Sequence, residues 1–363
     1  MFFHYTPSLL FLLFFAIIIL LTNHNIVVVI GNNKITTNNN YHQHQYRSLF
    51  IFHTGSYNNS GHLNESVWHN YPWENVHTIL MFSLYPELAE YARSVGANVA
   101  ISTGAPSDIK NATTRRQSIE NAINNCKIFK FCNSINLDIE RKAENNSNIS
   151  HELTVFVQEL AQAIEEAGEK YLLIYDAAAT PGYEGRYYDY NGLNNAGIDF
   201  FFVMDYDLND YNDPPPWNDH SMANSPAPAV AHGLQKLLEF IPAKKIVVGL
   251  PFYGYEYLGF FGKLPIISRQ LGIHEISSML IDPSWSHHFD NQSRTPYLIH
   301  GKGFTMKQIW YDDPTSIMEK IKIATQLGII YSGCWTGDAL DYSTNAPIPA
   351  SDFWNALLVQ QKG

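Results

Sequence analysis

The chain has 363 residues, of which 45% are hydrophobic and 14% aromatic, so it is long enough to bury a sizeable core. Its formal net charge is −11 at pH 7, with 23 Lys and Arg against 34 Asp and Glu, and it has no basic run. This balance argues against nucleic acid as a partner.

The first 30 residues are predicted to be a signal peptide or signal anchor. Residues 9–21 form an unbroken apolar run. This run is short for a bilayer span of about 20 residues but typical of a signal-peptide core. No Lys or Arg precedes it, and Ile26–Ile30 adds a second apolar stretch, so an uncleaved anchor is the alternative. We expect contact with a membrane only in that case.

Glycosylation signals follow along the chain and favour the secretory route together with the apolar segment. The N-x-S/T sequons begin at Asn58, Asn64, Asn111, Asn145, Asn148 and Asn291. Residues 31–46 are Asn-rich and of low complexity, and we expect them to be a linker with no fold of its own. The folded domain is expected over residues 47–357.

Periodic apolar segments predict the architecture of that domain. The predicted strands are Ser48–Thr54, Thr78–Ser83, Asn98–Ser102, Asn133–Glu140, Tyr171–Ala177, Asp199–Tyr206, Lys245–Tyr253 and Ile329–Trp335. The predicted helices are Pro86–Val95, His151–Ala167, Val230–Phe240 and Thr315–Leu327. Eight buried strands with interleaved helices predict the α/β class and a (β/α)8 TIM barrel. A doubly wound open sheet is the alternative, although no Gly-rich loop follows the first strand.

The barrel is longer than the usual size of roughly 250 residues, so an insertion is expected. We place it at Glu256–Met306, between the seventh and eighth strands, where it would form a lid or wall at the barrel mouth.

Three cysteines occur, and they show neither metal-ligand spacing nor a disulfide framework. A predicted strand between Cys126 and Cys132 would hold their Cα atoms too far apart for a disulfide. We therefore expect all three, including Cys334, to be buried free thiols.

Polar residues gather where the predicted strands end, which is where barrel enzymes carry their chemistry. Asp138 and Glu140 lie on one face of a strand, with Cα atoms roughly 6–7 Å apart, close enough to couple electrically. Tyr206 and Asp207, Tyr253 and Trp335 end three other strands.

Glycoside hydrolysis ordinarily needs two carboxylates on opposite sides of the bond, and neighbours on one strand cannot supply that. If Glu140 protonates the leaving oxygen, a 2-acetamido group of the substrate could attack the anomeric carbon instead. Asp138 would then bind the acetamido N–H and keep Glu140 protonated by repulsion. The alternative is a structural role, in which Arg141 and Lys142 pair with the two acids.

The motifs resemble those of the family 18 glycoside hydrolases. Asn133–Glu140 resembles the family's Asp-Gly-x-Asp-x-Asp-x-Glu signature. Met204–Asp207 resembles its Met-x-Tyr-Asp motif, Pro251–Tyr255 its Pro-x-Tyr-Gly stretch, and Trp335 a Trp that ends its last strand. The resemblance covers roughly residues 47–357 and supports the barrel.

Within that family the chain is most similar to the lysosomal chitobiases. They share the segments Trp310–Pro314 and Leu340–Ser343 and also carry Asn at the second acidic position, here Asn136. The resemblance implies a retaining hydrolase of GlcNAcβ1-4GlcNAc that acts in N-glycan oligosaccharide catabolism, in the lysosome or outside the cell. It implies GlcNAc-containing oligosaccharides as ligands, no cofactor and no metal, and we expect a monomer.

The resemblance also implies roles for single residues. Glu140 is the general acid and base, Asp138 orients the acetamido group, and Tyr206 aligns its carbonyl. Asp207 would contact the sugar and the acid, and Trp335 would form the floor under the reacting ring. The implied substrate-binding residues are Trp335, Asn136, Tyr253 and Ser102.

Two departures from the signature bear on activity. Asn133 and Ser134 replace its first Asp and Gly, where Asn can keep some structural hydrogen bonds. Asn136 removes a charge beneath Asp138, which would let Asp138 ionise more readily. A chitinase or endo-β-N-acetylglucosaminidase on longer chains is the second enzyme hypothesis. An inactive chitin-binding lectin is the rival, although Glu140 and Asp138 are both retained.

Overall fold

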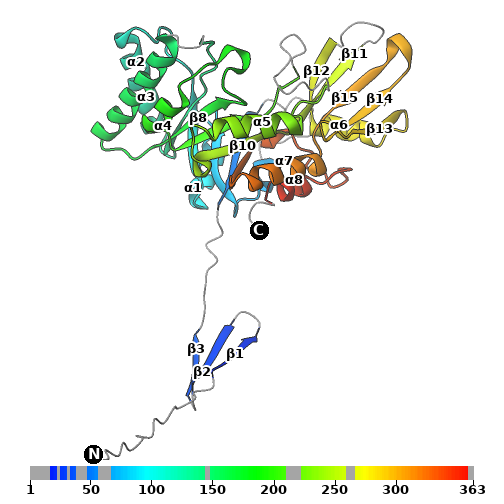
Figure 1. The fold of residues 1–363 in the computed structure, drawn as a ribbon, viewed down its shortest axis with the longest axis horizontal. Helices are drawn as coiled ribbons and strands as arrows, with labels where there is room; N and C mark the ends of the chain where they lie inside the picture. Colours follow the sequence, from blue (N-terminus) through cyan, green and yellow to red (C-terminus); the bar gives the residue numbers. More distant parts are fainter. Residues whose placement is uncertain are drawn as a thin grey trace, which may run out of the picture. The chain divides into compact units, whose positions relative to one another are not determined.

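The structure, a computed structural model, divides into two units, residues 1–46 and residues 47–363 (Figure 1). Among the residues that it describes, no helix is both long and apolar enough to cross a membrane. The described residues are 17–22, 25–30, 33–37, 47–55, 67–143, 148–209, 222–258 and 266–358.

The amino-terminal unit contains a small antiparallel sheet. Its strands are β1 (Ile17–Thr22), β2 (Asn25–Ile30) and β3 (Asn33–Thr37), with β2 in the centre. Strand β3 lies within residues 31–46, where the composition predicted no fold, because its backbone pairs with β2. The signal peptide or anchor over residues 1–30 stays a prediction.

The second unit is built on a closed barrel of parallel strands, in the order β10-β16-β4-β5-β6-β7-β8-β9. This confirms the predicted (β/α)8 barrel. The barrel strands are β4 (Leu49–His53), β5 (Val76–Met81), β6 (Asn98–Thr103), β7 (Ser134–Leu137), β8 (Leu172–Ala178), β9 (Phe200–Met204), β10 (Ile246–Pro251) and β16 (Tyr331–Trp335).

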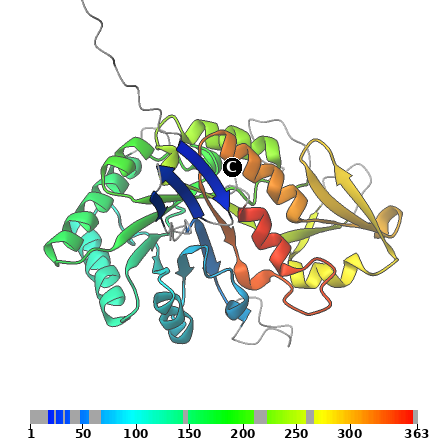
Figure 2. The ribbon, with the colours of Figure 1, turned by 90° about the horizontal axis from the view of Figure 1, so that it is seen from below.

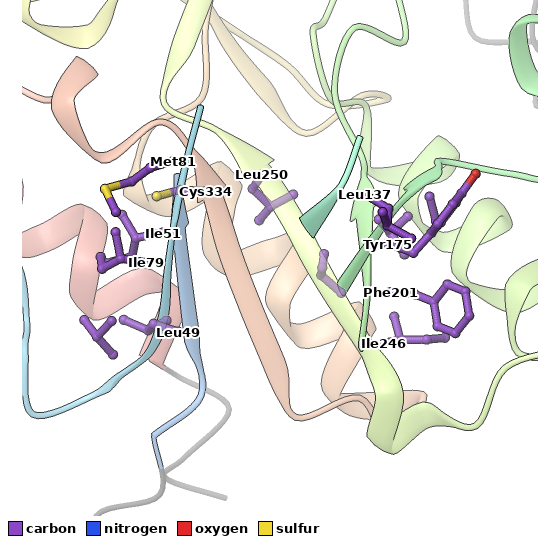
Figure 3. Packing of buried hydrophobic residues seen from close by; sticks show 14 of the residues in the cluster. Leu49, Ile51, Ile79, Met81, Leu137, Tyr175, Phe201, Ile246, Leu250 and Cys334 are labelled. Atoms are coloured by element: carbon purple, nitrogen blue, oxygen red, sulfur yellow. The ribbon is translucent and has the colours of Figure 1, made fainter. Parts of the chain in front are cut away.

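Alternation along these strands creates two apolar layers. Inside the barrel, Phe50, Phe52 and Phe202 pack together and fill the lumen. The intervening residues point outward into the layer between the strands and the surrounding helices. Figure 3 shows part of this outer layer, with Ile51 of β4 beside Ile79 of β5.

Helices cover the outside of the barrel. They are α1 (Pro86–Ser94), α2 (Ala112–Ile128), α3 (Asn148–Glu166), α4 (Tyr190–Asn195), α5 (Ala227–Leu237), α7 (Pro314–Gln326) and α8 (Ala350–Leu357). Short 3₁₀ turns occur at Val67–Asn70, Tyr183–Gly185, Ala243–Lys245, Gly303–Thr305 and Gly337–Ala339.

Helix α2 was not among the predicted helices. Most of its residues are polar, and its buried stripe includes Ile119, Ala122, Ile123 and Cys126, spaced three and four residues apart. The side-chain oxygen of Asn111 accepts hydrogen bonds from the backbone N–H groups of the first turn, which caps the helix. The cap and the spacing together were the available sequence signals.

The insertion between β10 and β16 forms a separate antiparallel sheet beside the barrel (Figure 2). Its strand order is β12-β11-β15-β14-β13. Its elements are β11 (Tyr253–Leu258), β12 (Ile266–Gly272), α6 (Ile273–Leu280), β13 (Trp285–Asp290), β14 (Thr295–His300) and β15 (Lys307–Trp310). The insertion is wider than predicted because β11 and β15 pair with each other.

The expectation of three free cysteines was wrong. Cys126 and Cys132 form a disulfide with a Cα–Cα distance of 5.1 Å, while Cys334 is free and buried. The segment between the paired cysteines is not a strand. It is the last turn of α2 followed by a tight turn, and β7 begins only at Ser134, so the chain reverses within six residues.

We predict that the denatured, unreduced protein exposes one reactive thiol, from Cys334. The double variant Cys126→Ser/Cys132→Ser should lower the free energy of unfolding by about 2 kcal/mol, because a short closed loop removes only modest entropy from the unfolded chain. Thiol titration and urea unfolding measure the two effects. Three reactive thiols in the unreduced parent protein would contradict the assignment.

Candidate active site

The two acids that the sequence singled out lie just beyond strand β7. The strand ends at Leu137, earlier than predicted, and the Asp138 backbone N–H continues the ladder by donating to the Thr103 carbonyl over 2.9 Å. Asp138 is half-buried, whereas the Glu140 side chain is 53% exposed. A proton donor at Glu140 is therefore accessible to a substrate from solvent.

Asp138 holds its proton unusually tightly. Burial is the main cause that raises its pKa from 3.8 to about 6, repulsion from Glu140 adds to this, and Arg186 opposes it. That Asn136 lets Asp138 ionise more readily than a second acid at this position would stays a prediction. Loss of one charge on β7 is outweighed by desolvation and by the neighbouring carboxylates.

The cation that pairs with Glu140 is Arg186. Its Nη1 lies 2.8 Å from Glu140 Oε2, and its Nη2 pairs with Glu184. The Arg186 side chain is only 6% exposed, so this ion pair is partly shielded from solvent. The structural alternative named Arg141 and Lys142 as the partners, but the Arg141 guanidinium donates to the Pro106 and Ser107 carbonyl oxygens.

A row of buried polar groups crosses three strands beside Asp138. The Asn136 side-chain amide donates to Ser102 Oγ over 3.0 Å and to Asp176 Oδ2 over 2.8 Å. The structure thus brings the predicted residues Asn136 and Ser102 together, and it adds Asp176, which sequence reasoning missed. The available signal was a single acid inside the apolar strand Leu172–Ala178.

Tyr206 and Asp207 both reach the barrel mouth because β9 stops at Met204. Asp207 has φ +58°, a left-handed backbone conformation that breaks the strand alternation. The Tyr206 ring centroid lies 6.2 Å from that of Tyr253 and 6.3 Å from that of Trp335. Burial raises the pKa of Tyr206 well above its usual range, so its hydroxyl remains a hydrogen-bond donor.

Asp207 is held by two tyrosines of the insertion sheet. The Tyr253 and Tyr255 hydroxyls each donate to Asp207 Oδ1 over 2.6 Å. Desolvation by the surrounding side chains raises its pKa, and the two hydroxyl bonds oppose this. Asp207 is exposed overall, so solvent screens this effect. The prediction that Tyr253 ends the seventh barrel strand was wrong, because Tyr253 begins β11 of the insertion sheet.

Trp335 ends the last barrel strand and packs over the lumen. Its ring centroid lies 4.9 Å from Phe52 and 5.7 Å from Phe82. The next residue, Thr336, donates to the buried carboxylate of Asp338, which also accepts from the Thr54 backbone and hydroxyl. These bonds tie the loop after Trp335 to the end of β4.

Asn133 has a structural role, as its position in the signature suggested. Its Oδ1 accepts from the Val99 N–H over 2.8 Å, and its Nδ2 donates to Asn98 Oδ1 over 2.7 Å. These bonds join β6 to the start of β7. Asn133 therefore acts at the barrel end opposite to Asp138 and Glu140.

Comparison with known proteins identifies the family. Residues 25–339 match the family described as glycosyl hydrolases family 18. The chain belongs to this family. It is 27% identical over 342 residues to the di-N-acetylchitobiase of Rattus norvegicus, covering 86% of this chain and 88% of the relative. The class V chitinase of Arabidopsis thaliana is 25% identical over 72% of each chain.

Solved structures share the fold of this family 18 glycosidase. Human YKL-39, described as a pseudo-chitinase with retained chitooligosaccharide binding, superposes with a TM-score of 0.68 at 15% identity. The match covers 87% of this chain and 100% of YKL-39. The chitinase RmChi1 from Rhizomucor miehei gives a TM-score of 0.65 at 17% identity, covering 86% and 100% of the two chains. At these identities the likeness concerns the fold alone.

We predict that Asp138→Asn raises the stability at pH 7. Because the folded pKa of Asp138 lies above its ordinary value, the folded chain binds this proton more tightly, and stability is lost as pH rises from about 4 through about 6. Removal of the charge should recover about 1 kcal/mol, less than the full shift because Asp138 is half-buried. Urea unfolding at pH 4 and pH 7 measures the stability of the parent protein and of Asp138→Asn. An equal loss of stability between the two pH values in both proteins would contradict the prediction.

We predict that Arg186→Met raises the pKa of Asp138 further. The Arg186 cation lowers that pKa, so its removal should raise the pKa by roughly one pH unit. Carboxyl ¹³C NMR titration measures the change. Arg141→Met is the matched control, because Arg141 donates to backbone carbonyl groups, and it should leave the pKa of Asp138 in place.

Proposed function

We propose that this glycosidase cleaves GlcNAcβ1-4GlcNAc with retention, by a substrate-assisted mechanism. The supporting observation is that Asp138 and the exposed Glu140 follow one strand end, at the mouth that also holds Tyr206. Acids from one strand approach the substrate from the same side. Asp207, from another strand, has one carboxylate oxygen occupied by two tyrosine hydroxyls, so it is a poor nucleophile.

The nucleophile is then the acetamido oxygen of the sugar. Glu140 gives its proton to the glycosidic oxygen as the bond to the anomeric carbon breaks, and the acetamido carbonyl oxygen closes on that carbon from the opposite face. Asp138 accepts a hydrogen bond from the acetamido N–H, and the Tyr206 hydroxyl donates to the carbonyl. Trp335 supports the ring from below. A water activated by Glu140 then opens the cyclic intermediate, which restores the original configuration.

The proposed substrate is the chitobiose core of N-glycan fragments, during oligosaccharide catabolism in the lysosome or outside the cell. The name of the rat relative supports the linkage, and the sequons at the exposed Asn111, Asn148 and Asn291 are compatible with secretion. The other sequons lie outside the described residues. A chitinase acting on longer chains is the second candidate, which the Arabidopsis thaliana relative favours.

We predict that Glu140→Gln lowers the rate of chitobiose hydrolysis by about 10²–10⁴-fold, the usual contribution of general acid catalysis. Glu184→Gln is the matched control, because Glu184 shares Arg186 with Glu140, and it should retain most activity. Reducing-sugar release from chitobiose is the measurement. A parent protein that binds chitobiose at pH 4–7 without hydrolysing it would favour the lectin hypothesis.

We predict that a GlcNAc tetramer labelled at its reducing end releases labelled GlcNAc as the first product. Removal of a single reducing-end sugar is what a chitobiose-core enzyme requires. Chromatography of early time points measures the products. Labelled dimers or trimers at the earliest times would instead support the chitinase hypothesis, and equal cleavage of an analogue without N-acetyl groups would exclude substrate assistance.

A further inference from the structure

Asp176 lies beside Asp138 in the wall of the barrel. Strands β7 and β8 are parallel and pair in register from Ser134 with Leu172 to Leu137 with Tyr175. The next pair along this register is Asp138 with Asp176. Ile174 points into the lumen and Tyr175 into the outer layer, so alternation turns Asp176 toward the lumen as well.

One of the two oxygens of the Asp176 carboxyl has a hydrogen-bond partner. Its Oδ2 accepts the 2.8 Å hydrogen bond from the Asn136 amide, whereas its Oδ1 has no partner in the described part of the chain. Both residues are buried, with Asp176 only 3% exposed. A deeply buried carboxylate with one amide donor is unfavourable, and a neutral carboxylic acid is the form that suits this site.

The electrostatic environment of Asp176 also favours its neutral form. Asp138 and Glu140, which follow β7, raise the pKa of Asp176 by repulsion, and Asp176 in turn raises the pKa of Tyr206, which follows β9. Burial, with repulsion from Asp138, raises the pKa of Asp176 well above its usual range, and the bond from Asn136 opposes this only in part. Because Asp176 is buried and Asp138 only half-buried, desolvation favours the neutral form more strongly at Asp176.

We propose that Asp176 is a positioning residue that stays protonated and donates its O–H, from the oxygen that Asn136 leaves free, to the charged form of Asp138. The family signature has an acid on β7 at the position of Asn136. In this chain the buried carboxyl lies instead on the neighbouring strand β8, at Asp176. The hydrogen bond holds the Asp138 carboxylate ready for the acetamido N–H of the substrate, so the inference rests on the proposed function. No proton is transferred, because Asp176 remains neutral throughout.

The test compares Asp176→Asn, which keeps a donor in place, with Asp176→Ala, which removes it. Carboxyl ¹³C NMR follows the titration of Asp138, assigned by the loss of its signal in Asp138→Asn. We expect Asp176→Asn to leave the pKa of Asp138 near 6 and Asp176→Ala to raise it by about one pH unit. Asp176→Leu replaces the Ala variant if that does not fold.

The matched control is Asp199→Ala. Asp199 accepts a hydrogen bond from the N–H of Leu173, which lies at the end of β8 opposite to Asp176. Removal of the Asp199 carboxylate should leave the pKa of Asp138 unchanged. An unchanged pKa in Asp176→Ala or Asp176→Leu would overturn the inference, since Asp176 would then be structural only. A lowered pKa in Asp176→Asn would also overturn it, because Asp176 would then be a repelling anion.

Kinetics provide the second arm of the test. In an active parent enzyme, Asp176→Asn should keep kcat on chitobiose within about threefold, while Asp176→Ala should lose roughly tenfold or more with little change in KM. Equal losses in the two variants would overturn the inference. An inactive parent protein would count against the proposed function alone, because the titration of Asp138 still decides the role of Asp176.

Discussion

Closure of a parallel barrel brings the carboxyl ends of all its strands to one rim, and side chains from different strands must share that space. Here the rim collects Asp138 after β7, Asp176 in β8 and Asp207 after β9. Desolvation raises the pKa of each carboxyl, and a neighbouring carboxyl group raises each of these pKa values further. Fully ionised, such a cluster would be strongly unfavourable, so part of it remains protonated at mildly acidic pH, which acid–base chemistry requires.

The surrounding residues offset the repulsion within this carboxyl cluster, each by a different interaction. Arg186 supplies positive charge to the exposed Glu140, where a full cation can be held near solvent. Asn136 contributes an uncharged amide to the deepest position, where a further charge would be most unfavourable. The insertion sheet adds Tyr253 and Tyr255, whose hydroxyls bind Asp207. The sheet therefore contributes two side chains to the site.

Sequence reasoning succeeded where periodicity dominates. The eight barrel strands and the helices α1, α3, α5 and α7 follow from alternating or amphipathic apolar residues that the barrel buries. It failed where the result depends on the exact residue at which an element begins or ends. The run ending at Glu140 reads as one strand, yet the paired part is Ser134–Leu137, and a turn rather than a strand lets Cys126 meet Cys132. Helix α2 was missed because most of its residues are polar and its buried apolar stripe is narrow.

The sequence alone determined the barrel and the family and singled out Asp138, Glu140 and Asp207 at the rim, because apolar periodicity and short motifs are local properties of the chain. Only the tertiary structure decided which groups face one another across strands. Nothing near Glu140 in sequence marks Arg186 as its partner, 46 residues away, and nothing near Asp138 marks Asp176 as its lateral neighbour. Strand register and barrel closure create those pairings, and they depend on every strand at once.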